Sequence, residues 1–149
     1  IDISDDALKV ADYNKKYNNA DYIKLIKSDM FSSSECEQYK NEDNRFDVIV
    51  SNPPYIPTKD IDELSEEVRL HDPVLALDGD TDGLKFYKAI TKQSVNYLKE
   101  NGYLCYEIGY NQAEDVRNIM EQCGYSGIKV IKDLAGLDRV VIGRLNNIN

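Results

Sequence analysis

The spacing of hydrophobic and polar residues shifts along the chain between a two-residue and a helical period, which predicts strands separated by helices. The run FDVIVS at 46–51 is short, β-branched and almost continuously apolar, as is typical of a buried strand. YLCYEIG at 103–109 predicts a second buried strand. Between them, the pattern at 83–102 predicts one long helix that ends at Gly102, because glycine commonly follows the last helical turn.

The first forty residues predict two helices and a strand. Residues 4–18 begin with Ser4 as a helix cap, followed by acids in the first turn and lysines near the end. Residues 22–29 alternate between apolar and polar, which predicts a half-exposed strand. Residues 32–41 form a short candidate helix.

The last forty residues predict a helix at 111–124, with Asn111 as its cap and Gly124 as its stop, and then two strands at 127–134 and 139–145. Strands separated by helices imply βαβ units and a mostly parallel sheet. No helix separates the last two strands, so we expect a hairpin in which one of them runs antiparallel. The sequence therefore predicts one α/β domain over residues 1–149.

Composition narrows the function classes. The chain has 149 residues, 42% of them hydrophobic, and a net charge of −9, with scattered basic residues. Such a charge disfavours a nucleic acid as the main partner. No apolar run approaches the ~18 residues of a membrane span. The three cysteines are odd in number and widely spaced, which favours a reducing, cytoplasmic setting over disulfides or zinc.

Three predicted strand ends carry polar residues, and ligands of open α/β sheets bind at such ends. The opening IDIS at 1–4 looks like the tail of a strand, which would end at Asp2. Asp2 could accept hydrogen bonds from a ribose diol, with a second-choice cap of the following helix as the alternative. Asp29 ends its strand in the same way, with a plain loop acid as the alternative. Asn52 ends the strand at 46–51.

Asn-Pro-Pro-Tyr at 52–55 points to specific chemistry. The Asn52 amide offers one acceptor and two donors in a plane, which complements a planar amino or amide group. Pro53 and Pro54 remove two N–H groups and hold the loop rigid, so its carbonyls point in fixed directions. Tyr55 supplies a flat wall. The loop therefore predicts a clamp for a planar –NH2 group, against the alternative of an Asn-Pro turn with a structural tyrosine.

Two other features of the sequence could indicate a calcium site or a hydrolase, but neither motif is complete. DGDTDG at 78–83 matches the start of a calcium loop, but its twelfth position is Ala89 instead of glutamate. Acids and glycines that cap the helix beginning near Leu84 explain this stretch better. His71, the single histidine, has no serine or cysteine partner in a recognisable hydrolase motif. We expect no metal site.

Six stretches together resemble class I S-adenosylmethionine-dependent methyltransferases, and most closely the HemK-type (PrmC) protein glutamine methyltransferases, which methylate the glutamine of the GGQ motif in peptide chain release factors. They are DISDDALKVADYN, SDMF, FDVIVSNPPYIP, DPVLALDGDTDGLKFYKAI, YEIGYNQ and DLAGLDRVVIGRL. Asn-Pro-Pro-Tyr alone is shared with nucleic-acid amino methyltransferases. The DPVLALDGDTDGL and EIG…Q segments favour the protein-glutamine family.

The resemblance implies a Rossmann-like class I methyltransferase sheet, mostly parallel with an antiparallel last strand pair. It implies that Asp2 binds the ribose of S-adenosylmethionine and that Asp29 and Met30 lie by the adenine. Asn52 would lie beside the methyl donor and bind the substrate amide, together with the Pro53 carbonyl. Pro54 would shape the loop and Tyr55 would pack on the substrate glutamine, so Asn52 and Tyr55 are the expected catalytic residues.

The chain departs from the family pattern at its start. It shows no glycine pair at G-x-G spacing, and the family's first strand, Gly-rich loop and N-terminal helical domain are expected to precede Ile1. We therefore expect a C-terminal part of the catalytic domain that is inactive alone and binds the cofactor weakly or not at all. We also expect it either to dimerise through the strand edges that the missing strand leaves exposed or to shift its strands to close the gap. Two alternatives stay open, which are a nucleic-acid (adenine or guanine) amino methyltransferase and a non-catalytic, calcium-linked binding module.

Overall fold

The computed structural model describes residues 1–146, which divide into two compact units, Ile1–Asn44 and the remainder from Arg45 onward. The helices of the first unit are α1 (Asp5–Tyr17) and the 3-10 helices η1 (Ser34–Lys40) and η2 (Glu42–Asn44). The helices of the second are η3 (Thr58–Glu63), α2 (Glu66–His71), α3 (Val74–Leu77), α4 (Lys85–Ser94) and α5 (Ala113–Gln122). The expectation of one domain over 1–149 stays a prediction. None of the helices in residues 1–146 has the length and apolar character needed to cross a bilayer.

The first unit is built around α1 and one pair of short parallel segments. The helix begins as predicted, because the Ser4 hydroxyl accepts a hydrogen bond from the Ala7 N–H (3.3 Å). The strand predicted at 22–29 is wrong over most of its length. Only Lys27 pairs, in a parallel bridge with Asp2, because the backbone exchanges just two hydrogen bonds there.

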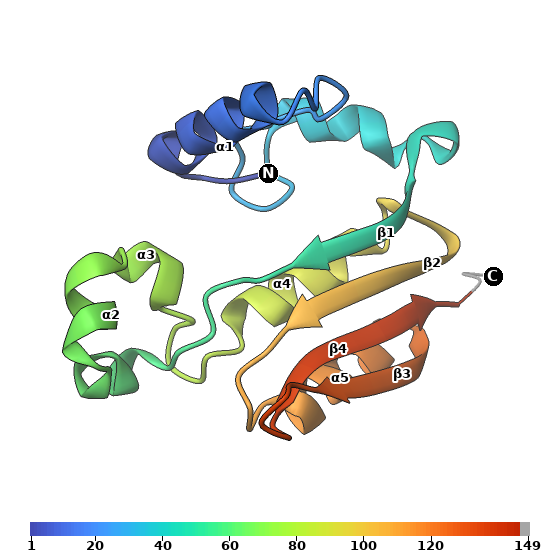
Figure 1. The fold of residues 1–149 in the computed structure, drawn as a ribbon. Coiled ribbons are helices and arrows are strands. Elements are labelled where there is room, and N and C mark those ends of the chain that lie inside the picture. Colours follow the sequence, from blue (N-terminus) through green and yellow to red (C-terminus); the bar gives the residue numbers. More distant parts are fainter. Residues whose placement is uncertain (147–149) are drawn as a thin grey trace. The chain divides into compact units, whose positions relative to one another are not determined.

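The second unit contains a four-stranded sheet in the order β1-β2-β4-β3 (Figure 1). Its strands are β1 (Phe46–Ser51), β2 (Leu98–Glu107), β3 (Tyr125–Lys132) and β4 (Asp138–Leu145). β1 and β2 are parallel, whereas β4 runs antiparallel to both β2 and β3. The predicted α/β class and the antiparallel last pair are therefore confirmed.

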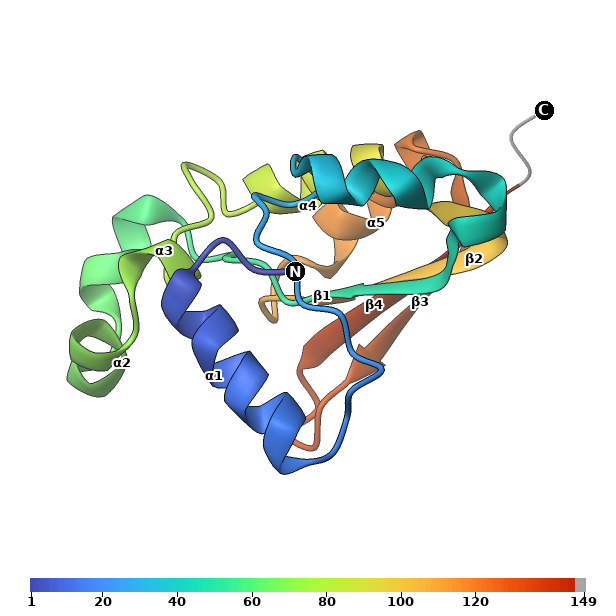
Figure 2. The same ribbon diagram turned by 90° about the horizontal axis from the view of Figure 1, so that it is seen from above.

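Helices α4 and α5 cover one face of this sheet (Figure 2). The core between the layers contains Tyr87, Tyr106, Val116 and Met120, all fully buried. The rings of Tyr87 and Tyr106 meet edge to face, with centroids 5.1 Å apart. Burial raises the pKa of both phenols well above the usual value. The hydroxyl of Tyr106 lies 2.8 Å from that of Thr91, so the core keeps its buried polar atoms paired.

The helix predicted at 83–102 is wrong in its second half. Helix α4 ends at Ser94, whose hydroxyl bonds the Thr91 carbonyl and lies 2.7 Å from the hydroxyl of Tyr125. The chain then turns, and Leu98 is fully buried as the first residue of β2. Gly102 consequently lies inside a strand. Tertiary packing overrides the helical periodicity of the segment that leads to Gly102, because burying Leu98 stabilises the strand.

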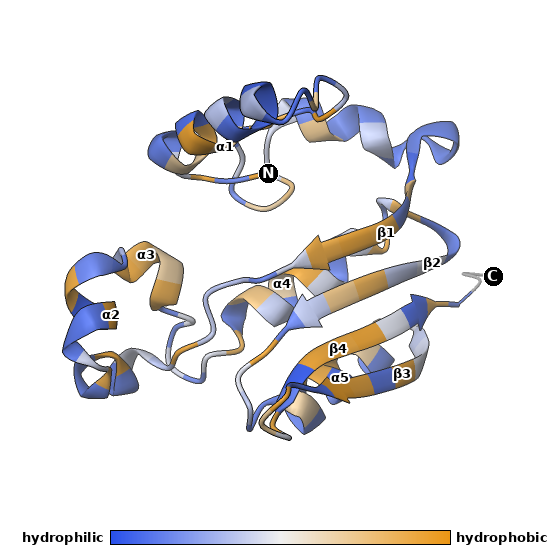
Figure 3. Ribbon diagram, in the orientation of Figure 1, coloured by the Kyte–Doolittle hydropathy of each residue, from blue (hydrophilic) through white to orange (hydrophobic). Residues whose placement is uncertain are grey.

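The prediction that 46–51 is buried is also wrong in this structure. β1 is a strand, but it lies at the edge of the sheet, and Val48 and Val50 keep 49% and 76% of their surface exposed. Figure 3 shows that β1 is nevertheless strongly hydrophobic. Both valines point to the face opposite the helices, as their register with Tyr103 and Cys105 shows. The pairing of this edge with another chain stays a prediction.

Candidate functional site

The segment Asn52–Pro57 leaves the end of β1 and is bound tightly to the stretch before α4. The N–H of Ile56 donates to the Leu77 carbonyl (3.0 Å), and the Gly79 N–H donates to the Ile56 carbonyl (2.8 Å). These bonds form a parallel bridge between Ile56 and Asp78. The loop is therefore held by backbone pairing, in addition to the rigidity of its prolines.

The carbonyl of Tyr55 is bound by a side chain from a third segment. Nε2 of Gln112 donates to it at 3.0 Å and to the Gly83 carbonyl at 3.3 Å. Oε1 of Gln112 accepts from the Gly109 N–H at 3.0 Å. One buried amide thus joins the loop after β1, the turn before α4 and the turn after β2.

Two glycines allow the backbones to approach this closely. A Cβ atom at Gly79 would lie 2.8 Å from the Cα atom of Tyr55. Gly83 has φ +71°, and a Cβ there would collide with the Tyr55 carbonyl oxygen. The glycines of the DGDTDG stretch are therefore needed by the Asn52–Tyr55 loop, a role that is independent of metal binding.

The four predicted clamp residues are held in different ways. Pro53 is buried, and Pro54 is half-buried. Tyr55 is half-buried, with its ring beside Gly109, where an added Cβ would lie 3.5 Å from Cδ2. Asn52 is exposed, and within residues 1–146 its side-chain amide has no hydrogen-bond partner. Its acceptor and donors are thus available to a ligand.

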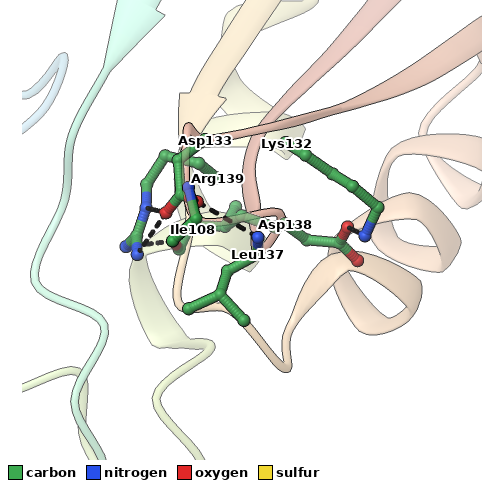
Figure 4. Close-up of polar contacts among 7 residues, drawn as sticks. Ile108, Lys132, Asp133, Leu137, Asp138 and Arg139 are labelled. Carbon is green, nitrogen blue, oxygen red and sulfur yellow. Dashed lines mark hydrogen bonds and ion pairs between the residues drawn. The ribbon is translucent and has the colours of Figure 1, made fainter.

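An ion pair between Arg139 and Asp133 joins the start of β4 to the end of β3 (Figure 4). Arg139 donates to Asp133 from Nη2 (3.2 Å) and Nε (3.3 Å), and to the Ile108 carbonyl from Nη1 (3.3 Å). The hydrogen bond from the Leu137 N–H, supported by Arg139, holds the pKa of Asp133 below its usual value. The Asp133 carboxylate in turn raises the pKa of Arg139, with a smaller contribution from Tyr55.

Three of the four predicted cofactor residues, Asp2, Asp29 and Met30, lie in the first unit, at the ends of its two parallel segments, whereas Asn52 belongs to the second unit. The Asp2 N–H donates to the Ile26 carbonyl (3.2 Å), and the Ser28 N–H donates to the Asp2 carbonyl (3.0 Å). Asp2 and Asp29 are exposed, and Oδ1 of Asp2 accepts from the Ser4 N–H at 2.8 Å. Met30 follows at a sharp turn with φ +51°. Asp2 thus also supports the helix start, and the cofactor role of the two acids stays a prediction.

The aspartates of the calcium-like stretch are turned toward neighbours in the chain. Asp78 accepts from the Thr58 hydroxyl (2.7 Å), and Asp82 accepts from the Leu84 N–H (2.9 Å) at the start of α4. The ion pair of Asp80 with Lys85 is the main cause that lowers the pKa of Asp80 to about 2. In residues 1–146, no three potential metal ligands gather into a cluster. The capping explanation of this stretch is supported by the Asp82 contact.

Sequence reasoning missed two residues of the site. Asn111 was expected to cap α5, but Gln112 occupies that position and its side chain points to the loop instead. Arg139 was treated as part of a strand. Gln112 lies in the YEIGYNQ stretch, five residues after the end of β2, and no local pattern marks its contact with the Asn52–Tyr55 loop.

Comparison with known proteins identifies the relatives. The model of the Eco57I restriction-modification methylase family matches residues 2–119. A release factor glutamine methyltransferase from Fusobacterium nucleatum is 41% identical over 144 residues, which are 97% of this chain and 39% of the relative. The one from Clostridium acetobutylicum is 40% identical over 142 residues, covering 95% of this chain and 48% of the relative.

A solved structure supports the fold. The crystal structure of a methyltransferase from Pyrococcus furiosus matches with a TM-score of 0.60 at 16% identity, over 97% of this chain and 60% of that one. The chain spans less than half the length of the two curated relatives. The family match over 2–119, the identities of 40% and 41%, and the fold shared with that methyltransferase agree with one another. The chain therefore belongs to the methylase family described by the Eco57I model, alongside the release factor glutamine methyltransferases that it resembles.

Proposed function

We propose that the whole protein that contains this chain transfers a methyl group from S-adenosylmethionine to the side-chain amide nitrogen of the GGQ glutamine of peptide chain release factors. The observation that carries the proposal is the exposed, unpaired Asn52 amide at the start of a loop whose backbone is held from two sides. The relatives that are release factor glutamine methyltransferases support the substrate class.

The loop would bind the glutamine amide through complementary donors and acceptors. Oδ1 of Asn52 would accept one substrate N–H, and the Pro53 carbonyl would accept the other. Pro54 would keep that carbonyl in place, and Tyr55 would cover the substrate side chain. Binding both N–H bonds fixes the orientation of the nitrogen lone pair, so the protein's contribution is orientation more than proton transfer.

Asp2, Asp29 and Met30 are the proposed partners of the methyl donor. A ribose diol needs acceptors, and two exposed carboxylates at one edge provide them. Oδ1 of Asp2 already accepts from the Ser4 N–H, so Oδ2 would face the ribose. When bound, S-adenosylmethionine supplies an electrophilic methyl group on a sulfonium.

The reaction balances without a metal ion or a covalent enzyme intermediate. The substrate nitrogen forms a bond to the methyl carbon while the carbon–sulfur bond breaks, and the bonding electrons stay on sulfur. The nitrogen then loses one proton to water. Asn52 and the loop carbonyls act by holding the nitrogen on the line of attack.

A nucleic-acid amino methyltransferase is the second candidate, because the matching family model is that of a restriction-modification methylase. An exocyclic amino group of adenine presents the same planar pair of N–H bonds. The charge of −9 argues against this candidate, as does the carboxylate-rich segment 60–72 that follows the loop. The acidic surface instead suits a basic protein substrate.

A competition between substrate classes tests the proposal. The whole protein is incubated with methyl-labelled S-adenosylmethionine and equal concentrations of a purified release factor, total RNA and unmethylated DNA. The proposal predicts label in the release factor alone, and no label when the GGQ glutamine has been replaced. Label in RNA or DNA but not in the release factor would establish the second candidate instead.

A further inference from the structure

We propose that Gln112 is a positioning residue that sets the conformation of the Asn52–Tyr55 loop through the Tyr55 carbonyl. The inference rests on the proposed function only for its kinetic consequence, because the contacts of Gln112 are a property of the chain itself. Gln112 is 57 positions from Tyr55 and belongs to a different βα turn.

The surroundings of Gln112 require an amide. The side chain is 93% buried, at 7% exposure, and all its polar atoms are bonded. Oε1 must face the Gly109 N–H, and the –NH2 group must face the carbonyls of Tyr55 and Gly83. A carboxylate of the same shape would place an acceptor against two carbonyl oxygens. A methionine of similar length would leave the same three backbone groups without this partner.

The position of Tyr55 is transmitted to Asn52 through a stiff connection. Only Pro53 and Pro54 separate the two residues, and both have a fixed φ. A displacement of the Tyr55 carbonyl therefore moves Asn52 instead of being absorbed by loop flexibility. Gln112 does not need to touch the substrate to change how well the Asn52 amide is aligned.

The kinetic signature of such a residue is a fall in kcat with little change in the KM of the methyl donor. Misplacement of a binding group by about 1 Å can cost up to ~100-fold in rate. We expect a fall of about 10- to 100-fold in kcat for both Gln112→Glu and Gln112→Met. Gln122→Glu, at the exposed far end of α5, is the control and is expected to keep the wild-type kcat.

Hydrogen exchange separates positioning from general stability and does not depend on activity. The Ile56 and Gly79 amides, which pair the loop to its neighbour, should exchange about 10-fold faster or more in both Gln112 variants. The amide of Leu104, in the centre of β2, should keep its wild-type rate. An equal acceleration at Leu104 would show that Gln112 merely stabilises the fold, and would overturn the inference.

The two proposals fail differently. If the wild-type protein does not methylate a release factor, the proposed function fails, while the exchange pattern still decides the role of Gln112. If the wild-type protein is active and both Gln112 variants keep wild-type kcat and exchange rates, the positioning role is wrong and the proposed function stands.

Discussion

The carbonyl oxygen of Tyr55 occupies the space that a side chain at Gly83 would need. A Cβ atom at Gly83 would collide with it, and would also lie 2.8 Å from Nε2 of Gln112. The turn before α4 and the loop after β1 are therefore matched to each other at the level of single atoms. This match gives a physical reason why the DGDTDG and Asn-Pro-Pro-Tyr stretches occur in one chain.

Gly83→Ala is expected to disturb the loop as well as the turn. The left-handed backbone costs an alanine about 1 kcal/mol, and the collision displaces the Tyr55 carbonyl in addition. We expect methyl transfer to fall at least ~10-fold. Gly136→Ala is the matched control, because Gly136 has φ +81° but nothing within 4 Å of the added Cβ. Equal activity of the two variants, at similar melting temperatures, would contradict this prediction.

The buried hydroxyl pair of Thr91 and Tyr106 should behave as one unit. Thr91→Val leaves the Tyr106 hydroxyl buried without its partner and is expected to lower the free energy of unfolding by about 1–3 kcal/mol. Adding Tyr106→Phe removes the unpaired group and should recover part of the loss. Urea denaturation of both single variants and the double variant measures the coupling. Strictly additive effects would show that the two hydroxyls do not stabilise each other.

The contacts of Asp133 predict a specific acid sensitivity. Its pKa is lowered in the folded state, mainly by the Leu137 N–H and also by Arg139. A lowered pKa stabilises the fold fully above the usual aspartate value of 3.8, and this contribution is lost as the pH falls through the lower folded value. Asp133→Asn should therefore be less stable than the wild type at pH 7, with a gap that narrows below about pH 4.

The measurement is the urea midpoint at pH 7, 5, 4 and 3, with the exposed Asp62→Asn as the control. The control should follow the wild type at each pH. A gap between Asp133→Asn and the wild type that stays constant from pH 7 to pH 3 would mean that the carboxylate of Asp133 contributes nothing through its charge.

Local sequence signals predict the structure correctly where it depends on contacts between residues that are close in the chain. The Ser4 cap, the Gly124 stop with φ +89° and the hairpin of β3 and β4 follow from capping and turn chemistry between near neighbours. The end of α4 did not follow from such signals. Its helical pattern continues to Gly102, but the helix ends at Ser94 and Leu98 is fully buried as the first residue of β2.

The candidate site also contains one residue that the local sequence indicates and another that only the folded chain brings into contact. Asn52 could be recognised from sequence because a polar residue directly follows an apolar strand. Gln112 could not, because its role depends on three backbone segments that meet only in the folded chain. The exposure of Val50 could not be predicted either, because an apolar strand has the same hydrophobic pattern at the edge and in the centre of a sheet.

The proposed function depends most directly on Asn52. The whole protein, as wild type and as Asn52→Ala, is incubated with labelled S-adenosylmethionine and a purified release factor, and the methyl group is mapped by mass spectrometry. Asn96→Ala, another exposed asparagine, is the control. The proposed function predicts a methyl group on the GGQ glutamine in the wild type and the control, and a loss of at least ~100-fold in the rate of transfer in Asn52→Ala at an unchanged melting temperature. Methylation of that glutamine at the wild-type rate by Asn52→Ala would contradict it.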